Sequence, residues 1–137
     1  MNIYESVTEI VSWYKDLPKD YSNINDLIYA RQKLSTYQFY MAVDLGDLRE
    51  DWKQKEVETE IVRRKKSVEC IMDSLAMTKV QEISKHEALE KYQIEKEADA
   101  NYHKVKFIIE STQEVNNTIM QHISQLKLEQ KNLQSQT

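Results

Sequence analysis

Hydrophobic residues recur in steps of three and four along the last part of the chain, from Tyr102 to Leu133. Such spacing places them on one stripe of an α-helix, close to the seam of a coiled coil. No glycine or proline interrupts this stretch. We expect one continuous helix with the inward positions Tyr102, Val105, Ile109, Thr112, Asn116, Ile119, Ile123, Leu126 and Leu133.

A shorter apolar pattern near the N-terminus predicts a first helix over residues 3–17. Asn2 is suited to cap this helix, and Glu5 stands at the third position after it, as in a capping box. Because Pro18 disfavours helical geometry in the preceding residue, the helix is expected to end there. Residues 18–25 then form a polar connection.

A second helix is predicted over residues 25–76. Gly46 lies inside it and costs about 1 kcal/mol relative to alanine, so it marks either a close helix approach, a kink or a break. A break is possible because Asp47 and Glu50 would form a new capping box, but we favour a continuous helix. Its inward positions are Leu27, Ala30, Leu34, Tyr37, Met41, Leu45, Leu48 and Trp52.

The third predicted helix covers residues 79–131. Its start is defined less sharply than the others, because two capping boxes follow each other in the sequence. Thr78 with Gln81 forms the first, and Ser84 with Glu87 forms the second. The helix opens with a polar half and continues into the stripe described above.

Folding the second helix back on the third pairs their apolar parts, 27–52 with 102–126. The sparsely apolar parts, 53–66 and 85–101, then pair nearer the turn. The predicted fold is therefore all-α: a short N-terminal helix plus a long antiparallel helical hairpin, coiled-coil-like, in a single domain spanning residues 1–137.

This arrangement leaves more apolar surface than one elongated chain covers, so we expect a homo-oligomer. The predicted oligomerisation residues lie on or beside the last stripe. They are Phe107, Ile119, Ile123 and Leu126. Replacing Ile119 and Ile123 with aspartate is expected to dissolve the oligomer.

Composition supports a helical protein. The chain has one glycine and one proline in 137 residues, far below the usual roughly 7 % and 5 %. Its apolar runs are too short to cross a bilayer. The N-terminus has neither a basic segment nor an apolar h-region, so we expect no signal peptide. The lone Cys70 excludes an intramolecular disulfide and suits a reducing cytoplasmic location.

Motifs for catalysis are missing from the sequence. His86, His103 and His122 are not spaced for a helical zinc site, and none has a glutamate three residues earlier, as a di-iron bundle requires. No phosphate-cradling or dinucleotide motif occurs either. Cys70 stands among apolar residues and is interpreted as a small core residue. We therefore expect no enzyme, no metal and no cofactor.

The charge is distributed unevenly, although the formal net charge is only −4. Residues 53–66 carry six cations against three glutamates, a net of +3, while residues 87–99 carry five acids against two lysines, a net of −3. One interpretation is that these segments pair across the hairpin, each exposed bridge contributing about 0–1 kcal/mol. The other is a phosphate-binding patch, with the cations Lys53, Lys55, Arg63, Arg64, Lys65 and Lys66.

Three aromatic residues lie near this basic run in the sequence. They either provide rings on which unpaired bases stack or belong to the buried stripe, and we favour the second interpretation. They are Tyr37, Tyr40 and Trp52.

From Tyr102 the run YHKVKFIIESTQEVNNTIMQHISQLK resembles the C-terminal helix of the UvsY-type recombination mediators of tailed phages. The residues that carry the likeness are Tyr102, Phe107, Ile108, Ile109, Ser111, Ile119, His122 and Ile123. The resemblance covers about a quarter of the chain.

It implies a non-enzymatic helical subunit that forms rings, binds single-stranded DNA and helps load a RecA-like recombinase onto DNA occupied by a single-strand-binding protein. The location implied is the cytoplasm of a phage-infected host cell. The family's basic residues fall in the middle of its chains, and the six cations above are the nearest candidates. The alternative is a helical structural or adaptor protein that binds other proteins and no nucleic acid, which the low pI and the opposed charges favour.

Overall fold

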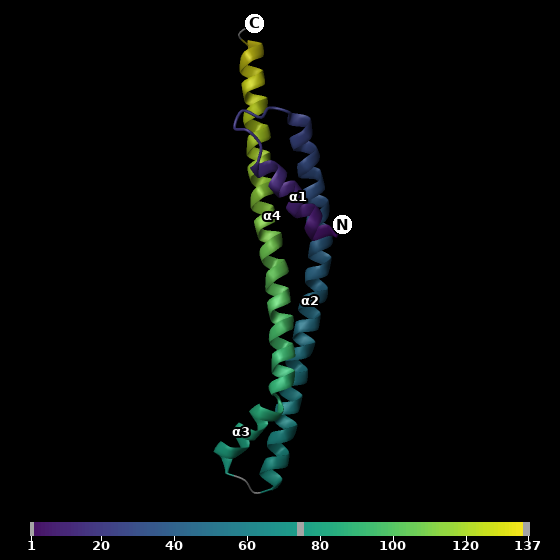
Figure 1. Cartoon of the computed structure of the whole chain (residues 1–137), viewed down its shortest axis with the longest axis vertical. Helices are drawn as coiled ribbons and strands as arrows, with labels where there is room; N and C mark the ends of the chain where they lie inside the picture. The colour runs from purple at the N-terminus through teal and green to yellow at the C-terminus, as the bar shows by residue number, and fades with distance from the viewer. Residues whose placement is uncertain (1, 74–75, 136–137) are drawn as a thin grey trace. The chain divides into compact units, whose positions relative to one another are not determined.

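The computed structural model describes residues 2–73 and 76–135, and these form four α-helices (Figure 1). They are α1 (Ile3–Lys15), α2 (Ile24–Met72), α3 (Met77–Glu87) and α4 (Leu89–Ser135). The described residues contain no β-strand. The all-α prediction, with a short first helix and two long helices, is confirmed.

The chain divides into two compact units. Unit 1 comprises residues 1–43 and 106–137, and unit 2 comprises residues 44–105. Helices α2 and α4 contribute to both units. The expectation of a single domain stays a prediction.

In unit 1, α1 begins with the predicted capping box. The Asn2 Oδ1 atom accepts a hydrogen bond from the Glu5 backbone N–H at 2.8 Å, and the Asn2 amide lies 3.5 Å from the Glu5 carboxylate. The helix ends at Lys15, two residues earlier than predicted. Asp16 closes it by donating its backbone N–H to the Ser12 carbonyl at 3.1 Å. The terminus is thus satisfied before Pro18 is reached.

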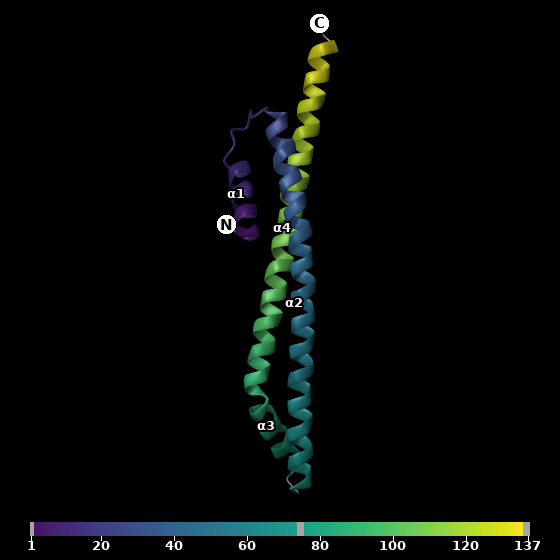
Figure 2. The ribbon, with the colours of Figure 1, turned by 90° about the vertical axis from the view of Figure 1, so that its right-hand side faces the viewer.

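The core of unit 1 joins α2 and α4, which lie side by side in Figures 1 and 2. Contacts between them pair rising residue numbers on α2 with falling numbers on α4, so the two helices are antiparallel, as predicted for the hairpin. Helix α1 adds Val7 to this core. Its buried members are Val7, Leu27, Leu34, Met41, Ile119 and Ile123.

His122 on α4 contacts both α1 and the connection between α1 and α2. Its Nε2 atom lies 3.0 Å from the Tyr21 carbonyl oxygen, and its Nδ1 atom lies 3.3 Å from the Tyr14 hydroxyl on α1. Both contacts are partly buried, so the imidazole replaces water for two polar groups that packing would otherwise leave unpaired. His122 therefore has a structural role in unit 1.

Helix α2 passes through Gly46 without a break, which confirms the favoured interpretation. A Cβ added to Gly46 would meet no atom within 4 Å. Within this chain, Gly46 therefore does not serve a close approach of two helices. Helix α2 ends at Met72 rather than at the predicted residue 76, and residues 74–75 lie outside the described part of the chain.

In unit 2 the predicted third helix is divided at Ala88 into α3 and α4, so the expectation of one helix over residues 79–131 is wrong. The Ser84 hydroxyl bonds the Val80 carbonyl at 2.6 Å and lies 2.7 Å from the Ser67 hydroxyl on α2. The Ser84 hydroxyl is thus engaged inside α3 and does not cap α4. The Ser84–Glu87 capping box consequently does not form, and Ala88 is buried at the break.

The buried side chains of unit 2 are small or polar. None of those that the structure describes is larger than valine or threonine: Thr59, Cys70, Val80, Ser84, Ala88, Ala98 and Val105. The larger Trp52 ring is half-buried and stacks on Tyr102 with centroids 5.3 Å apart. This pairing of 52 with 102, like that of 67 with 84, fits the predicted antiparallel course.

Candidate nucleic-acid interface

The predicted basic run lies on α2 in unit 2, and most of its cations are paired with glutamates of the same helix. Every such pair joins residues three or four apart, the spacing at which helical side chains are neighbours. The pairs are Lys53–Glu56 (3.7 Å), Lys55–Glu58 (3.9 Å), Arg63–Glu60 (3.6 Å), Arg64–Glu60 (2.9 Å) and Lys66–Glu69 (3.4 Å). Lys65 makes no ion pair within the described residues.

Neither interpretation of the charges anticipated this pairing along the helix. Among the described residues, no ion pair joins the basic run to the acidic segment 87–99. Hydrogen bonding to Glu69 of the same helix raises the pKa of the Lys66 ammonium above its ordinary value. The negative charge of Glu87 on α3 raises this pKa further, as a long-range attraction to the start of the acidic segment. Local glutamates therefore weaken the positive field that the run offers to a phosphate.

Arg63 borders a cavity of about 410 Å³ between α2 and α4. The other charged groups around it are carboxylates: Glu56, Glu60 and Glu95. The Arg63 Nε atom is buried and has no hydrogen-bond partner. A cavity with three carboxylates repels phosphate, so Arg63 does not make it an anion site.

The three aromatic residues considered for base stacking are differently placed. Trp52 stacks on Tyr102 inside unit 2, and Tyr37 packs against the core of unit 1. Tyr40 is 51 % exposed, and its ring meets that of Phe39 edge-on at 5.7 Å. Of the three, Tyr40 offers the largest free face.

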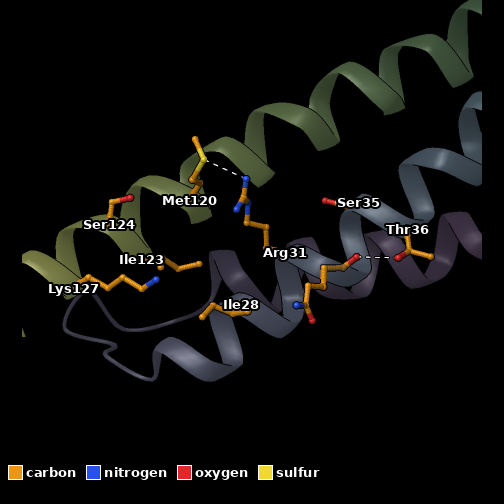
Figure 3. A pocket seen from close by; sticks show the side chains of 9 residues that line it. Ile28, Arg31, Ser35, Thr36, Met120, Ile123, Ser124 and Lys127 are labelled. Atoms are coloured by element: carbon orange, nitrogen blue, oxygen red, sulfur yellow. Dashed lines mark hydrogen bonds between the residues drawn. The ribbon is translucent and has the colours of Figure 1, made fainter.

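A different surface in unit 1 has the chemistry of an anion site. It is a cavity of about 660 Å³ between α2 and α4, which we call the α2–α4 groove (Figure 3). In Figure 3, Ile28 and Arg31 on α2 face Met120, Ile123 and Lys127 on α4. The groove is lined by Ile28, Arg31, Gln32, Ser35, Thr36, Met120, Ile123, Ser124 and Lys127.

The α2–α4 groove contains two cations and no carboxylate. The Arg31 Nη2 atom lies 3.2 Å from the Met120 sulfur, and a thioether is only a weak acceptor. Neither Arg31 nor Lys127 makes an ion pair in the part of the chain that the structure describes. Arg31 and Lys127 have no carboxylate to neutralise them and lie beside hydroxyl groups, so they can donate charge-assisted hydrogen bonds to a phosphate. Most cations of the basic run are already paired with glutamates.

A neighbouring cavity of unit 1 shows the contrast. It has a volume of about 350 Å³ and lies between α1 and α2. Lys33 lines it, but so do the carboxylates Glu9 and Asp26. The Lys33 ammonium also lies 5.0 Å from the centre of the Tyr29 ring, where a cation–π attraction holds it. This cavity does not favour an anion.

Sequence reasoning missed the α2–α4 groove because its cations are isolated. Arg31 and Lys127 stand far apart along the chain, and neither belongs to a cluster of basic residues. Because the predicted hairpin already placed these two segments of α2 and α4 side by side, the proximity of Arg31 and Lys127 could have been predicted. Counting charges segment by segment does not detect cations that come together from two separate segments.

The predicted oligomerisation residues are distributed between core and surface. Ile119 is 0 % exposed and Ile123 is 7 % exposed, both within the core of their own chain, and Leu126 packs against that core. For Ile119 and Ile123 the prediction needs correction, because α2 and α1 cover the stripe that was expected to bind a second copy. Phe107 is 68 % exposed and is free for contact.

Two further observations concern metal-binding groups and membrane-spanning helices. Within the described residues, no three histidine, cysteine, aspartate or glutamate side chains come together as a metal site would require. None of the described helices is both long and apolar enough to cross a membrane.

No family model, curated protein or solved structure matches this chain. The resemblance to UvsY-type mediators therefore stays a prediction.

Proposed function

We propose that this protein is a non-enzymatic recombination mediator that binds single-stranded DNA as an oligomer and helps load a RecA-like recombinase onto DNA covered by a single-strand-binding protein. The observation that carries the DNA-binding part is the α2–α4 groove, where Arg31 and Lys127 have no carboxylate beside them. The resemblance of the segment from Tyr102 carries the recombination part.

Each type of groove residue has a counterpart in a DNA strand. The Arg31 guanidinium and the Lys127 ammonium bind phosphate oxygens, the guanidinium through its fork of N–H donors. The Ser124 hydroxyl adds a further donor on the α4 side. Apolar side chains, among them Ile28 and Met120, provide contacts for sugars and unpaired bases. Two cations make few phosphate contacts, so the affinity of one chain is modest and strongly salt-dependent.

The basic run of unit 2 has a secondary role in this proposal. Its cations Lys53, Lys55, Arg63, Arg64 and Lys66 reach phosphate only by exchanging a glutamate for it, whereas Lys65 is free to bind directly. The groove is therefore expected to contribute more binding energy than the run.

Fluorescence anisotropy with labelled oligo-dT tests the site assignment. The double variant Arg31→Glu, Lys127→Glu is expected to lose more affinity than Arg63→Glu, Arg64→Glu. A matched control, Lys104→Glu with Lys106→Glu, makes the same change in net charge at exposed positions on α4 and is expected to retain most binding. Equal losses in all three double variants would show that only net charge matters and would overturn the groove as the site.

The mediator part needs its own assay. Addition of the protein is expected to speed assembly of a RecA-like recombinase on single-stranded DNA that is already covered by a single-strand-binding protein. The groove variant should fail in this assay. Full stimulation by the groove variant would separate mediation from DNA binding and contradict the proposal.

A second candidate function is a helical adaptor that binds proteins only. Exposed apolar side chains on α2, Val57, Ile61 and Val68, favour it, because solvated helices seldom present such residues in series. Absence of oligo-dT binding even at low salt, together with recovery of a defined protein partner, would select this function over the first.

A further inference from the structure

Helix α2 carries a row of exposed apolar residues in unit 2, which we call the α2 seam. Val57, Ile61, Val68 and Ile71 are each between 54 % and 58 % exposed. With Arg64, whose side chain is 79 % exposed, they follow one another in alternating steps of four and three. That alternation is the spacing of a coiled-coil seam, and a single solvated helix has no need of it.

The opposite face of the same helix is already occupied. Thr59 and Cys70 are each 3 % exposed, and Ser67, which lies on the side between the two faces, bonds Ser84 of α3. Unit 2 thus buries the Thr59 hydroxyl and the Cys70 thiol of α2 while leaving the four aliphatic residues of the α2 seam more than half exposed. The usual distribution is the reverse. A partner that covers the α2 seam would resolve this conflict.

A heptad assignment separates the two faces. Ile61 and Val68 take position a, while Val57, Arg64 and Ile71 take position d. Thr59 and Lys66 then take position f, the position farthest from a coiled-coil partner. Cys70 takes position c, whereas Ser67, which bonds Ser84 of α3, takes position g beside the seam. A helix docked on the α2 seam therefore leaves the buried contacts of Thr59 and Cys70 in place.

The charges beside the seam indicate a second copy of this chain. Glu58 and Lys65 take successive e positions, and these residues have opposite charges. In an antiparallel pair centred between residues 61 and 64, Glu58 of each copy, which pairs with Lys55 of its own helix at 3.9 Å, also faces Lys65 of the other copy. Lys65, which has no ion pair within the described residues of one chain, thereby gains one on each side of the axis.

Arg64 decides between the two directions. A parallel, in-register pair would place the two Arg64 guanidinium groups in one layer, where like charges repel. The antiparallel pair places Arg64 opposite Ile61, whose side chain packs against the aliphatic part of the arginine. It also brings Val57 opposite Val68. We propose that two copies of the chain associate through antiparallel pairing of their α2 seams.

Sedimentation or light scattering across a concentration series tests the association. The variant Ile61→Glu, Val68→Glu is expected to reduce the mass of the wild-type assembly by at least half while keeping its helical circular dichroism. Met77→Glu with Leu89→Glu is the matched control, because both residues are exposed and apolar, belong to unit 2 and lie off the seam. A monomeric wild type, or an unchanged mass in the seam variant, would overturn the proposal.

Disulfide trapping tests the direction. On a Cys70→Ala background, Val57→Cys and Val68→Cys chains are made separately, mixed and oxidised. A disulfide between the two different chains is expected, and neither chain alone should form one efficiently. Self-linking of Val57→Cys chains would show a parallel pair and overturn the antiparallel arrangement.

This inference goes beyond the proposed DNA binding and can fail independently of it. The seam variant leaves Arg31 and Lys127 unchanged, so oligo-dT binding by each chain is expected to persist after the seam is broken. The pair would also cover Arg64 and Lys65, which limits the access of DNA to the basic run.

Discussion

The Asn116 side-chain amide on α4 donates a hydrogen bond to the Ser35 hydroxyl on α2 at 3.0 Å. Asn116 is 4 % exposed, so its end of this polar contact is buried, whereas Ser35 is exposed. Its Oδ1 atom has no hydrogen-bond partner. The contact places one polar layer between α2 and α4 and thereby disfavours other registers of the two helices.

Asn116→Ala is expected to lower the free energy of unfolding by about 1 kcal/mol, because the hydrogen bond between the buried Asn116 amide and the exposed Ser35 hydroxyl is lost. Urea denaturation measures the change. Asn117→Ala is the control: its residue is exposed and its side chain bonds Gln113 of the same helix. A loss of more than about 0.5 kcal/mol in the control would contradict this assignment of the buried contact.

Ile119→Ala tests the corrected role of the α4 stripe. Since Ile119 is 0 % exposed and belongs to the buried core cluster of unit 1, truncation is expected to cost about 2–5 kcal/mol of stability. Phe107→Ala removes a larger but exposed side chain and is expected to change stability by no more than about 0.5 kcal/mol. Thermal or urea unfolding of both variants decides the matter. A stable Ile119→Ala protein of reduced mass would restore the residue to an interface between copies.

Gly46→Ala is expected to stabilise the protein by about 0.5–1 kcal/mol. The glycine lies inside α2, its added methyl group meets no atom within 4 Å, and alanine loses less backbone entropy on forming a helix. Urea denaturation gives the difference. Destabilisation would reveal a contact at this position that a single chain does not contain.

Tyr14 gives the stability a dependence on pH at the alkaline end. Burial raises the pKa of its hydroxyl above the ordinary value. The folded chain therefore keeps this proton when the unfolded chain releases it, and stability falls as the pH rises above about 10. In Tyr14→Phe this contribution is missing. Urea denaturation at pH 8 and above pH 10 should show that the free energy of unfolding falls less in Tyr14→Phe than in the wild type. Equal decreases in the two proteins would contradict this role of Tyr14.

The helices were predictable because their signals are local. The capping of α1 by Asn2 and the continuity of α2 through Gly46 depend on residues within a few positions of one another. The break at Ala88 was not predictable in this way, since Ser84 is diverted from capping by a contact with Ser67 on another helix. Neither capping box predicted for the third helix is used: α3 begins after Ala76, which makes no side-chain capping bond, and both Thr78 and Ser84 lie inside α3.

The site was harder to predict than the fold. Charge counting identified the basic run correctly as a cluster, but the partners of its cations are set by the three- and four-residue spacing along α2, as Arg64 with Glu60 shows. Arg31 and Lys127 can be recognised as one candidate site only when α2 and α4 are placed side by side. The burial of Ile119 likewise depends on which of two apolar faces the chain itself covers.

The salt dependence of oligo-dT binding tests the central claim most directly. Each phosphate contact adds about −0.7 to the slope of the logarithm of the binding constant against the logarithm of salt concentration. Replacing Arg31 and Lys127 with glutamine is therefore expected to weaken binding and to make the slope shallower by about 1.4. An unchanged slope and affinity in this variant would show that DNA does not bind in the α2–α4 groove.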